Sequence, residues 1–105
     1  MTQQELIEKL QQLKPVLKKE GITLLGIFGS YARNEQTPQS DVDILYDIDD
    51  PKAFAKRFGG FGAFTRLEEL KRFISKNLNM KVDFVAKKGL NSVSKKFIEK
   101  DLLNV

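Results

Sequence analysis

A Gly-Ser pair and an Asp-x-Asp pair, separated by ten residues, constrain this sequence more than any other feature. Gly29-Ser30 follows the apolar run 22–28, and Asp41-Val42-Asp43 leads into the apolar run 44–48. Both runs have the length of a strand, so the two pairs are expected at the mouths of two strands. Gly29 lets the backbone approach a phosphate without a Cβ, and Ser30 adds a hydroxyl and an N–H at a helix start, where the dipole favours anions. The stretch therefore predicts a phosphate site beside a cation site.

The two aspartates are spaced so that their carboxylates share one face of a strand. Alternation along the strand places Asp41 and Asp43 about 6.5 Å apart, and two negative charges at that distance repel by roughly 2–3 kcal/mol at an effective dielectric constant near 20. A shared cation would relieve this repulsion. Carboxylate oxygens favour Mg²⁺ or Mn²⁺, which bind through one or two carboxylates together with substrate phosphates.

A third carboxylate, Asp83, comes from another predicted strand and lies on the face opposite its apolar neighbours Val82 and Phe84. If that strand lies beside the strand of Asp41 and Asp43, three carboxylates converge, which is the arrangement that two-metal phosphoryl or nucleotidyl transfer uses. The third carboxylate can also take the proton from an attacking hydroxyl. Neither the Gly-Ser pair nor the Asp-x-Asp pair is specific alone. Their combination with Asp83, on separately predicted strands, is what indicates the site.

Other sites are excluded by residue type. The sequence has no Cys and no His, which removes disulfides, thiolate metal sites and the commonest general base. An EF-hand loop starting at Asp41 fails because Leu45 and Tyr46 stand where a ligand and a glycine belong. No Gly-Lys-Ser/Thr occurs, so a Walker phosphate loop is excluded as well.

The remaining pattern predicts one domain, residues 1–105, with element order αβαβααβα. The predicted strands are 22–28, 41–48 and 81–86. This order indicates an α/β or α+β fold, a small mixed sheet with helices packed on it. The Gly59–Gly62 stretch is interpreted as a plain connection, with a lid or a partner contact as alternatives.

Local signals set the predicted helix ends. Thr2 with Glu5 forms a capping box for the first helix, which Pro15 ends or kinks, or else continues as the start of a second turn. A short helix covers 30–34, and Asp50-Pro51 opens another. Thr65 with Glu68 predicts a second capping box before a helix that ends at Asn79. Ser92 caps a last helix that reaches about Leu102.

Charge and hydropathy limit the partners and the cellular location that the sequence predicts. The net charge is +4, with lysines crowded in the last quarter of the chain. Such a tail can meet RNA, nucleotide phosphates or an acidic partner, but a solvated helix face is the favoured interpretation. No apolar run approaches the roughly 20 residues that span a membrane, and the N-terminus has no signal-peptide pattern. A cytoplasmic protein without a membrane partner is expected.

The Gly-Ser and Asp-x-Asp motifs resemble those of a known superfamily. Gly29-Ser30, ten residues and Asp41-x-Asp43 resemble the signature of the DNA polymerase β-like nucleotidyltransferases. The fuller motifs Gly-Ser-Tyr-Ala-Arg…Ser-Asp-Val-Asp-Ile-Leu and Lys-Val-Asp-Phe-Val are similar to those of the minimal nucleotidyltransferases (MNT proteins), over nearly the whole chain. Asn34 departs from the usual glycine of that family, and asparagine tolerates the left-handed conformation.

The resemblance implies a polymerase β-like fold and an enzyme that uses ATP with Mg²⁺, two ions being possible and Mn²⁺ able to substitute. By position, Asp41, Asp43 and Asp83 would form the metal-binding and catalytic triad. The nucleotide would be held by four residues: Gly29, Ser30, Arg33 and Ser40.

The resemblance also implies a partner. Such proteins commonly act as antitoxins to a HEPN-domain ribonuclease toxin, and some transfer AMP onto a toxin tyrosine, so a hetero-oligomer is expected and direct nucleic-acid binding is not. Two alternatives stay open from the sequence. One is a non-catalytic module that neutralises the toxin by contact; the other is transfer to a small-molecule hydroxyl, for which no second domain is left to form an acceptor pocket.

Overall fold

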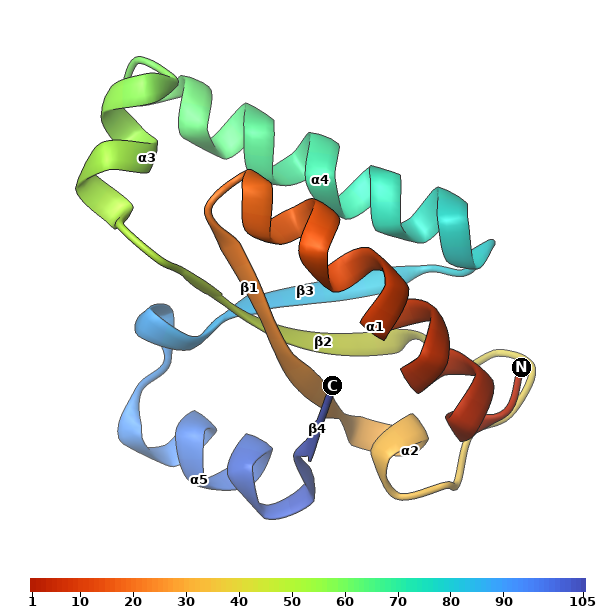
Figure 1. Cartoon of the computed structure of the whole chain (residues 1–105). Coiled ribbons are helices and arrows are strands. Elements are labelled where there is room, and N and C mark those ends of the chain that lie inside the picture. The colour runs from red at the N-terminus through yellow and green to blue at the C-terminus, as the bar shows by residue number, and fades with distance from the viewer.

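The computed structural model describes residues 1–105, in which strands are interspersed with helices (Figure 1). The elements are α1 (Gln3–Lys19), β1 (Ile22–Phe28), α2 (Gly29–Ala32), β2 (Val42–Ile48), α3 (Pro51–Arg57), α4 (Gly62–Leu78), β3 (Val82–Ala86), the 3₁₀ turn η1 (Lys87–Gly89), α5 (Ser92–Asp101) and β4 (Leu103–Asn104). No helix is both long and apolar enough to cross a membrane.

The four strands form one mixed sheet in the order β3-β2-β1-β4. β1 pairs antiparallel with β2 on one side and with β4 on the other. β2 and β3 are parallel, and α3 and α4 make the connection between them, as parallel neighbours require. The mixed α+β class predicted from the sequence is confirmed.

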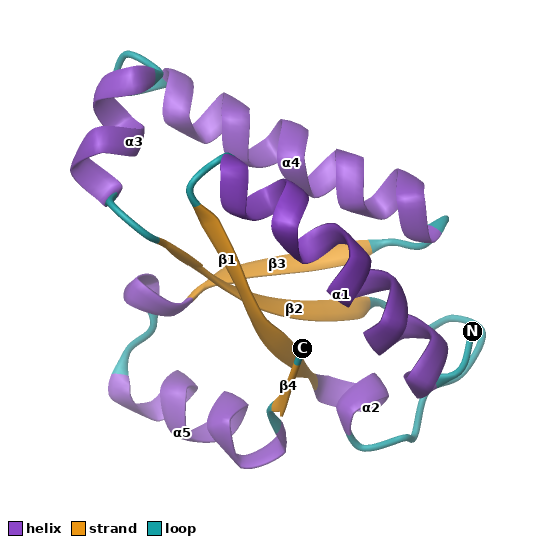
Figure 2. Cartoon of the chain, viewed as in Figure 1, coloured by secondary structure: helices purple, strands orange, loops and turns teal.

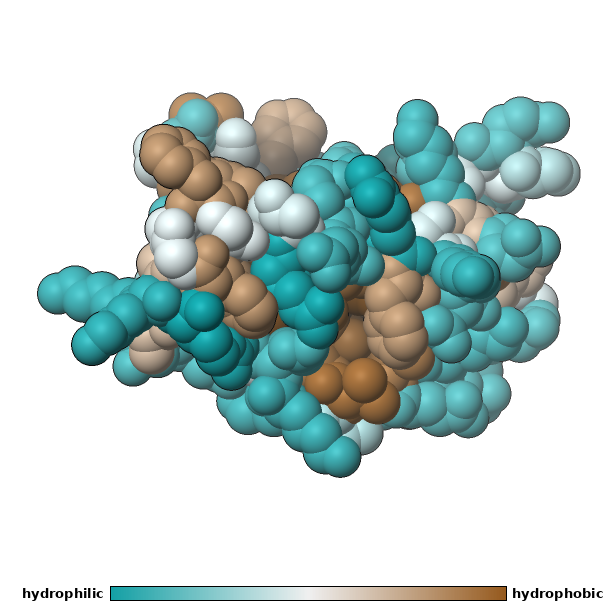
Figure 3. Space-filling model, turned by 90° about the horizontal axis from the view of Figure 1, so that it is seen from above, coloured by the Kyte–Doolittle hydropathy of each residue, from teal (hydrophilic) through white to brown (hydrophobic).

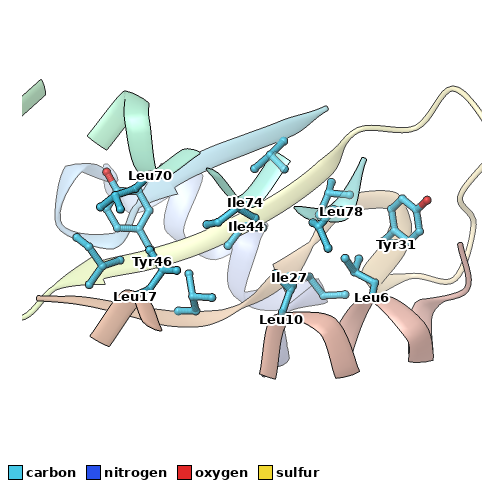
Figure 4. Packing of buried hydrophobic residues seen from close by; sticks show 14 of the residues in the cluster. Leu6, Leu10, Leu17, Ile27, Tyr31, Ile44, Tyr46, Leu70, Ile74 and Leu78 are labelled. Carbon is cyan, nitrogen blue, oxygen red and sulfur yellow. The ribbon is translucent and has the colours of Figure 1, made fainter. Parts of the chain in front are cut away.

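The core lies between one face of the sheet and the two long helices α1 and α4 (Figure 4). Alternate residues of β2 supply its floor: Val42, Ile44 and Tyr46 are all buried. The helices contribute side chains at helical spacing, which the sequence periodicity anticipates. These buried helix residues are Leu6, Leu10, Leu17, Leu70, Ile74 and Leu78.

The shorter helix α5 lies on the opposite side of the sheet from α1 and α4 (Figure 2). Asp43, Leu45 and Asp47 alternate with the core residues of β2, so they belong to the face that α5 partly covers. The site predicted from the sequence therefore lies on the sheet face that the main core does not use.

Several predicted boundaries are confirmed. β1 begins and ends at the predicted residues, and the Thr2–Glu5 capping box is present. Asp50 accepts a hydrogen bond from the Ala53 N–H, and Asn79 ends α4 in the left-handed conformation. Gly21, with φ +85°, follows the end of α1.

Other predicted boundaries differ from the structure. The short helix α2 covers Gly29–Ala32 rather than 30–34, and β2 and β3 each begin one residue later than predicted. Pro15 does not end α1, which continues through it to Lys19 and buries Leu17 in the core. α4 begins three residues before Thr65, at Gly62, with no side-chain cap at all. α5 is capped by Asn91, whose side chain accepts from the Ser94 N–H, and not by Ser92.

The α3–α4 connection explains the early start of α4. Gly59 and Gly60 both adopt positive φ, at +69° and +74°, so the chain turns directly from one helix into the next. The turn leaves Phe61 and Phe64 exposed, at 87% and 68%. Apart from exposed apolar residues of this kind, hydrophilic side chains cover much of the upper face of the molecule (Figure 3). The Gly59–Gly62 stretch is thus the connection that the sequence favoured.

Candidate active site

Gly29 brings the turn after β1 against a carboxylate of β2. Its φ is +73°, a conformation that side chains with a Cβ rarely adopt. Phe28, just before it, pairs with Asp43 across the antiparallel strands. A Cβ at position 29 would overlap the Asp43 carboxylate. Glycine is therefore required twice, for the backbone conformation and for the contact.

Ser30 lies in the first turn of α2, directly after that glycine. Its side chain is partly exposed and makes no hydrogen bond within the protein. The hydroxyl is thus free to donate to an external acceptor next to the Asp43 carboxylate. Ser30, which the sequence predicts to bind phosphate, thus lies next to the contact between Gly29 and Asp43.

Asp43 and Asp83 are direct partners on the parallel strands β2 and β3. Partial burial raises the pKa of Asp43, and the neighbouring charges of Asp83 and then Asp41 raise it further, while Arg33 opposes them. The ionised form of Asp43 is therefore electrostatically unfavourable in the folded protein, and a bound cation would stabilise it.

Asp41 precedes β2 and is exposed, with its carboxylate 4.0 Å from the ammonium group of Lys81. The strands of Asp43 and Asp83 are adjacent, as the three-carboxylate arrangement needs. In this structure, however, no three acidic side chains lie close enough together to form a ready-made metal site. Two carboxylates on neighbouring strands still fit Mg²⁺, which takes its other ligands from substrate phosphates and water.

Arg33 and Ser40 contact protein groups rather than open space. The Arg33 guanidinium forms ion pairs with Asp101 of α5 at 3.0 Å and with Glu35 at 3.4 Å. Ser40 Oγ accepts a hydrogen bond from the Thr37 N–H at 2.9 Å, within the loop that leads to Asp41. Both residues are therefore placed to stabilise the surroundings of the site. Arg33 links the end of α2 to α5, and Ser40 stabilises the loop that leads into β2.

Asp101 is the residue at this site that sequence reasoning missed. It lies 68 positions from its partner Arg33 and belongs to no motif, so no local signal could have identified the pair. Asn34, beside Arg33, has φ 59° and so adopts the left-handed conformation expected of it.

Known proteins match nearly the whole chain. Residues 4–104 match the family model described as "Nucleotidyltransferase domain". The chain is 38% identical over 106 residues to "Putative protein adenylyltransferase MJ1379" of Methanocaldococcus jannaschii, covering 99% of this chain and 98% of that protein. It is 32% identical over 104 residues to "Protein adenylyltransferase MntA" of Thermococcus cleftensis, covering 94% and 95%.

A solved structure shares the fold. It is described as a "putative minimal nucleotidyltransferase" and superposes with a TM-score of 0.73 at 20% identity, covering 100% of this chain and 97% of that one. The family model, which spans almost all of the chain, carries the assignment beyond fold. The protein belongs to the nucleotidyltransferase domain family and is, as a member of it, a nucleotidyltransferase.

Proposed function

We propose that this protein transfers AMP from Mg·ATP to a hydroxyl of a partner protein. The acceptor we propose is a tyrosine of a HEPN-domain ribonuclease toxin, so that the chain acts as the antitoxin. One observation carries the proposal: the positive-φ turn at Gly29 packs on Asp43, and Asp43 stands opposite Asp83. The names of the relatives, protein adenylyltransferases, support the same reaction.

The residues of this chain take separate roles in that reaction. The turn at Gly29 and the Ser30 hydroxyl bind the β- and γ-phosphates of ATP. Asp41 and Asp43, with Asp83, would hold Mg²⁺, which when bound neutralises phosphate charge and polarises the α-phosphate. Arg33 and Ser40 hold α2 and the preceding loop in place around the nucleotide.

The transfer step exchanges one bond at the α-phosphorus of ATP for another. The acceptor oxygen forms a bond to the α-phosphorus of ATP, and the bond from that phosphorus to the bridging oxygen of the β-phosphate breaks. Pyrophosphate leaves with the electron pair. Asp83 is exposed and lies on the edge strand, so it can accept the hydroxyl proton and release it to solvent. The same exposure gives a hydroxyl on another protein access to the site.

The proposal is tested with α-labelled ATP, Mg²⁺ and the toxin encoded by the adjacent gene. Wild-type protein is expected to transfer label to the toxin. Asp41→Asn and Asp43→Asn are each expected to reduce transfer by about 10²-fold or more, because charge stabilisation at the reacting phosphate is lost. Glu8→Gln is the matched control, since Glu8 is an exposed acid on α1, away from the site.

The same assay decides between the proposal and its alternatives. If wild-type protein labels nothing while both aspartate variants still neutralise the toxin, the protein is a binding module and the catalytic proposal is wrong. Label that appears only on added small-molecule hydroxyls would contradict the proposed protein acceptor. Transfer that survives both substitutions would contradict the metal-binding assignment.

A further inference from the structure

We infer that the cavity between α5 and the sheet binds the adenine base of ATP. This inference rests on the proposed function and adds to it the site that would recognise the base. The cavity has a volume of about 150 Å³. Its apolar wall consists of Leu25, Leu45, Leu90, Ile98 and Leu102.

The size of the cavity selects a ligand fragment. A volume of about 150 Å³ suits a single flat ring system. Sites that enclose a whole drug-sized ligand measure roughly 300–1,000 Å³. The cavity is thus large enough for a base but too small for a complete nucleotide, so the sugar and phosphates would lie outside it.

The position of the cavity places those phosphates at the proposed site. Leu45 lies two residues after Asp43 on β2 and points to the same face, about 6–7 Å further along the strand. The ribose of a nucleotide spans a distance of this order between its base and its α-phosphate. A base against Leu45 therefore leaves the α-phosphate within reach of Asp43.

The polar rim of the cavity suits a base that carries a phosphate chain. Three charged residues, Lys87, Lys95 and Glu99, line the cavity, and their net positive charge favours an anionic ligand. Lys95 is bound only by a 4.0 Å exposed ion pair to Glu99, which costs little to open. Asn104 also lines the cavity, and its amide offers both a donor and an acceptor, as the edge of adenine requires.

An ion pair connects the cavity wall formed by α5 to the turn after β1. Arg33, next to the phosphate-binding turn, holds Asp101 at the end of α5. Leu102 follows directly and belongs to the cavity wall. The ion pair thus ties the position of the proposed base site to that of the phosphate site.

The test compares Mg·ATP with magnesium tripolyphosphate, which lacks a base, by calorimetric titration of the full chain. Ile98→Phe fills the cavity and is expected to weaken ATP binding by about tenfold or more, leaving tripolyphosphate within about twofold. Val93→Phe is the matched control: Val93 is on the same helix but 68% exposed, so neither ligand should be affected.

A second variant and a spectroscopic readout guard against misfolding of Ile98→Phe. Asn104 is exposed, so Asn104→Leu should fold, and it is expected to weaken ATP but not tripolyphosphate. In methyl-labelled wild-type protein, ring-current shifts at Leu45 and Ile98 are expected with ATP and not with tripolyphosphate.

The outcomes separate this inference from the proposed function. If wild-type protein binds both ligands, but ATP binding survives in both variants and the methyl resonances do not shift, the base lies elsewhere and the inference is wrong while nucleotide binding stands. If wild-type protein binds neither ligand, the proposed function is contradicted and the inference falls with it.

Discussion

At the scale of single residues, the metal-binding role proposed for Asp43 conflicts with the stability of the metal-free fold. Its carboxylate is partly buried beneath the Gly29 turn and faces two other acids, and these surroundings raise its pKa. A residue selected only for stability would be neutral here. The arrangement is typical of a site that waits for a cation, and it makes a prediction about the metal-free protein.

Asp43→Asn is expected to stabilise the metal-free protein at neutral pH. Because the pKa of Asp43 is raised in the folded state, the folded protein binds more protons than the unfolded chain between the ordinary value of 3.8 and the raised value. Stability therefore falls as the pH rises through that window, and the full cost is present above it. Removing the charge should add up to about 1 kcal/mol, allowing for solvent screening.

Thermal unfolding in EDTA measures this gain. About 1 kcal/mol corresponds to roughly 4–8 °C for a domain of this size. The difference between variant and wild type should shrink toward zero as the pH falls below the ordinary carboxyl range. A variant that is less stable than wild type at pH 7, or a gap that is independent of pH, would contradict the electrostatic account of Asp43.

At the scale of elements, the two-residue strand β4 was not predicted from the sequence. It pairs with β1 at Gly26 and Ile27. A Cβ at position 26 would overlap the Leu103 carbonyl oxygen and lie 2.9 Å from Leu102 Cδ1. Glycine in the middle of a strand is otherwise unfavourable, so this one marks the close approach of a second backbone.

Gly26→Ala is expected to displace β4 and destabilise the fold by about 1–3 kcal/mol, as overpacking in a tight contact does. Gly89→Ala is the matched control, because a Cβ there meets nothing within 4 Å and should change stability by less than about 0.5 kcal/mol. Urea unfolding of both variants checks the prediction. Equal stability of the two would show that β4 does not depend on this contact.

The elements also show which features a sequence can predict. The strands β1 and β2 were predicted well, because runs of apolar residues and alternation are local signals. Whether α1 continues past Pro15 was left open by the sequence, because the continuation depends on burial of Leu17 against distant residues. Likewise, no local pattern shows that Asp101 pairs with Arg33, or that α5 covers the face of Leu45.

At the scale of the whole molecule, the sheet separates two tasks. One face packs on α1 and α4 and contains nearly all of the buried core. The other carries Asp43 and Leu45 and is covered only in part, by α5. Ligand binding on the second face should therefore stabilise the entire domain without requiring the core to rearrange, which gives a global readout of the local site.

Mg·ATP is expected to raise the melting temperature of the wild-type protein, and removal of the metal should abolish most of the rise. At a free concentration of 100 times Kd, binding adds about 2.7 kcal/mol, or roughly 10–20 °C for a domain of this size. ATP in EDTA should give a much smaller shift, because Asp43 and Asp83 then repel the phosphates. The measurement is a melting curve at fixed ATP with increasing Mg²⁺.

Asp43→Asn gives the decisive comparison in this titration. It should start higher than wild type without metal and gain little from Mg·ATP, so that the two melting curves cross as Mg²⁺ is added. Crossing requires one carboxylate both to destabilise the empty fold and to anchor the ligand. A uniform offset at every Mg²⁺ concentration would mean that Asp43 destabilises the fold but does not hold the metal, and the site would then have to be reassigned to Asp41 and Asp83.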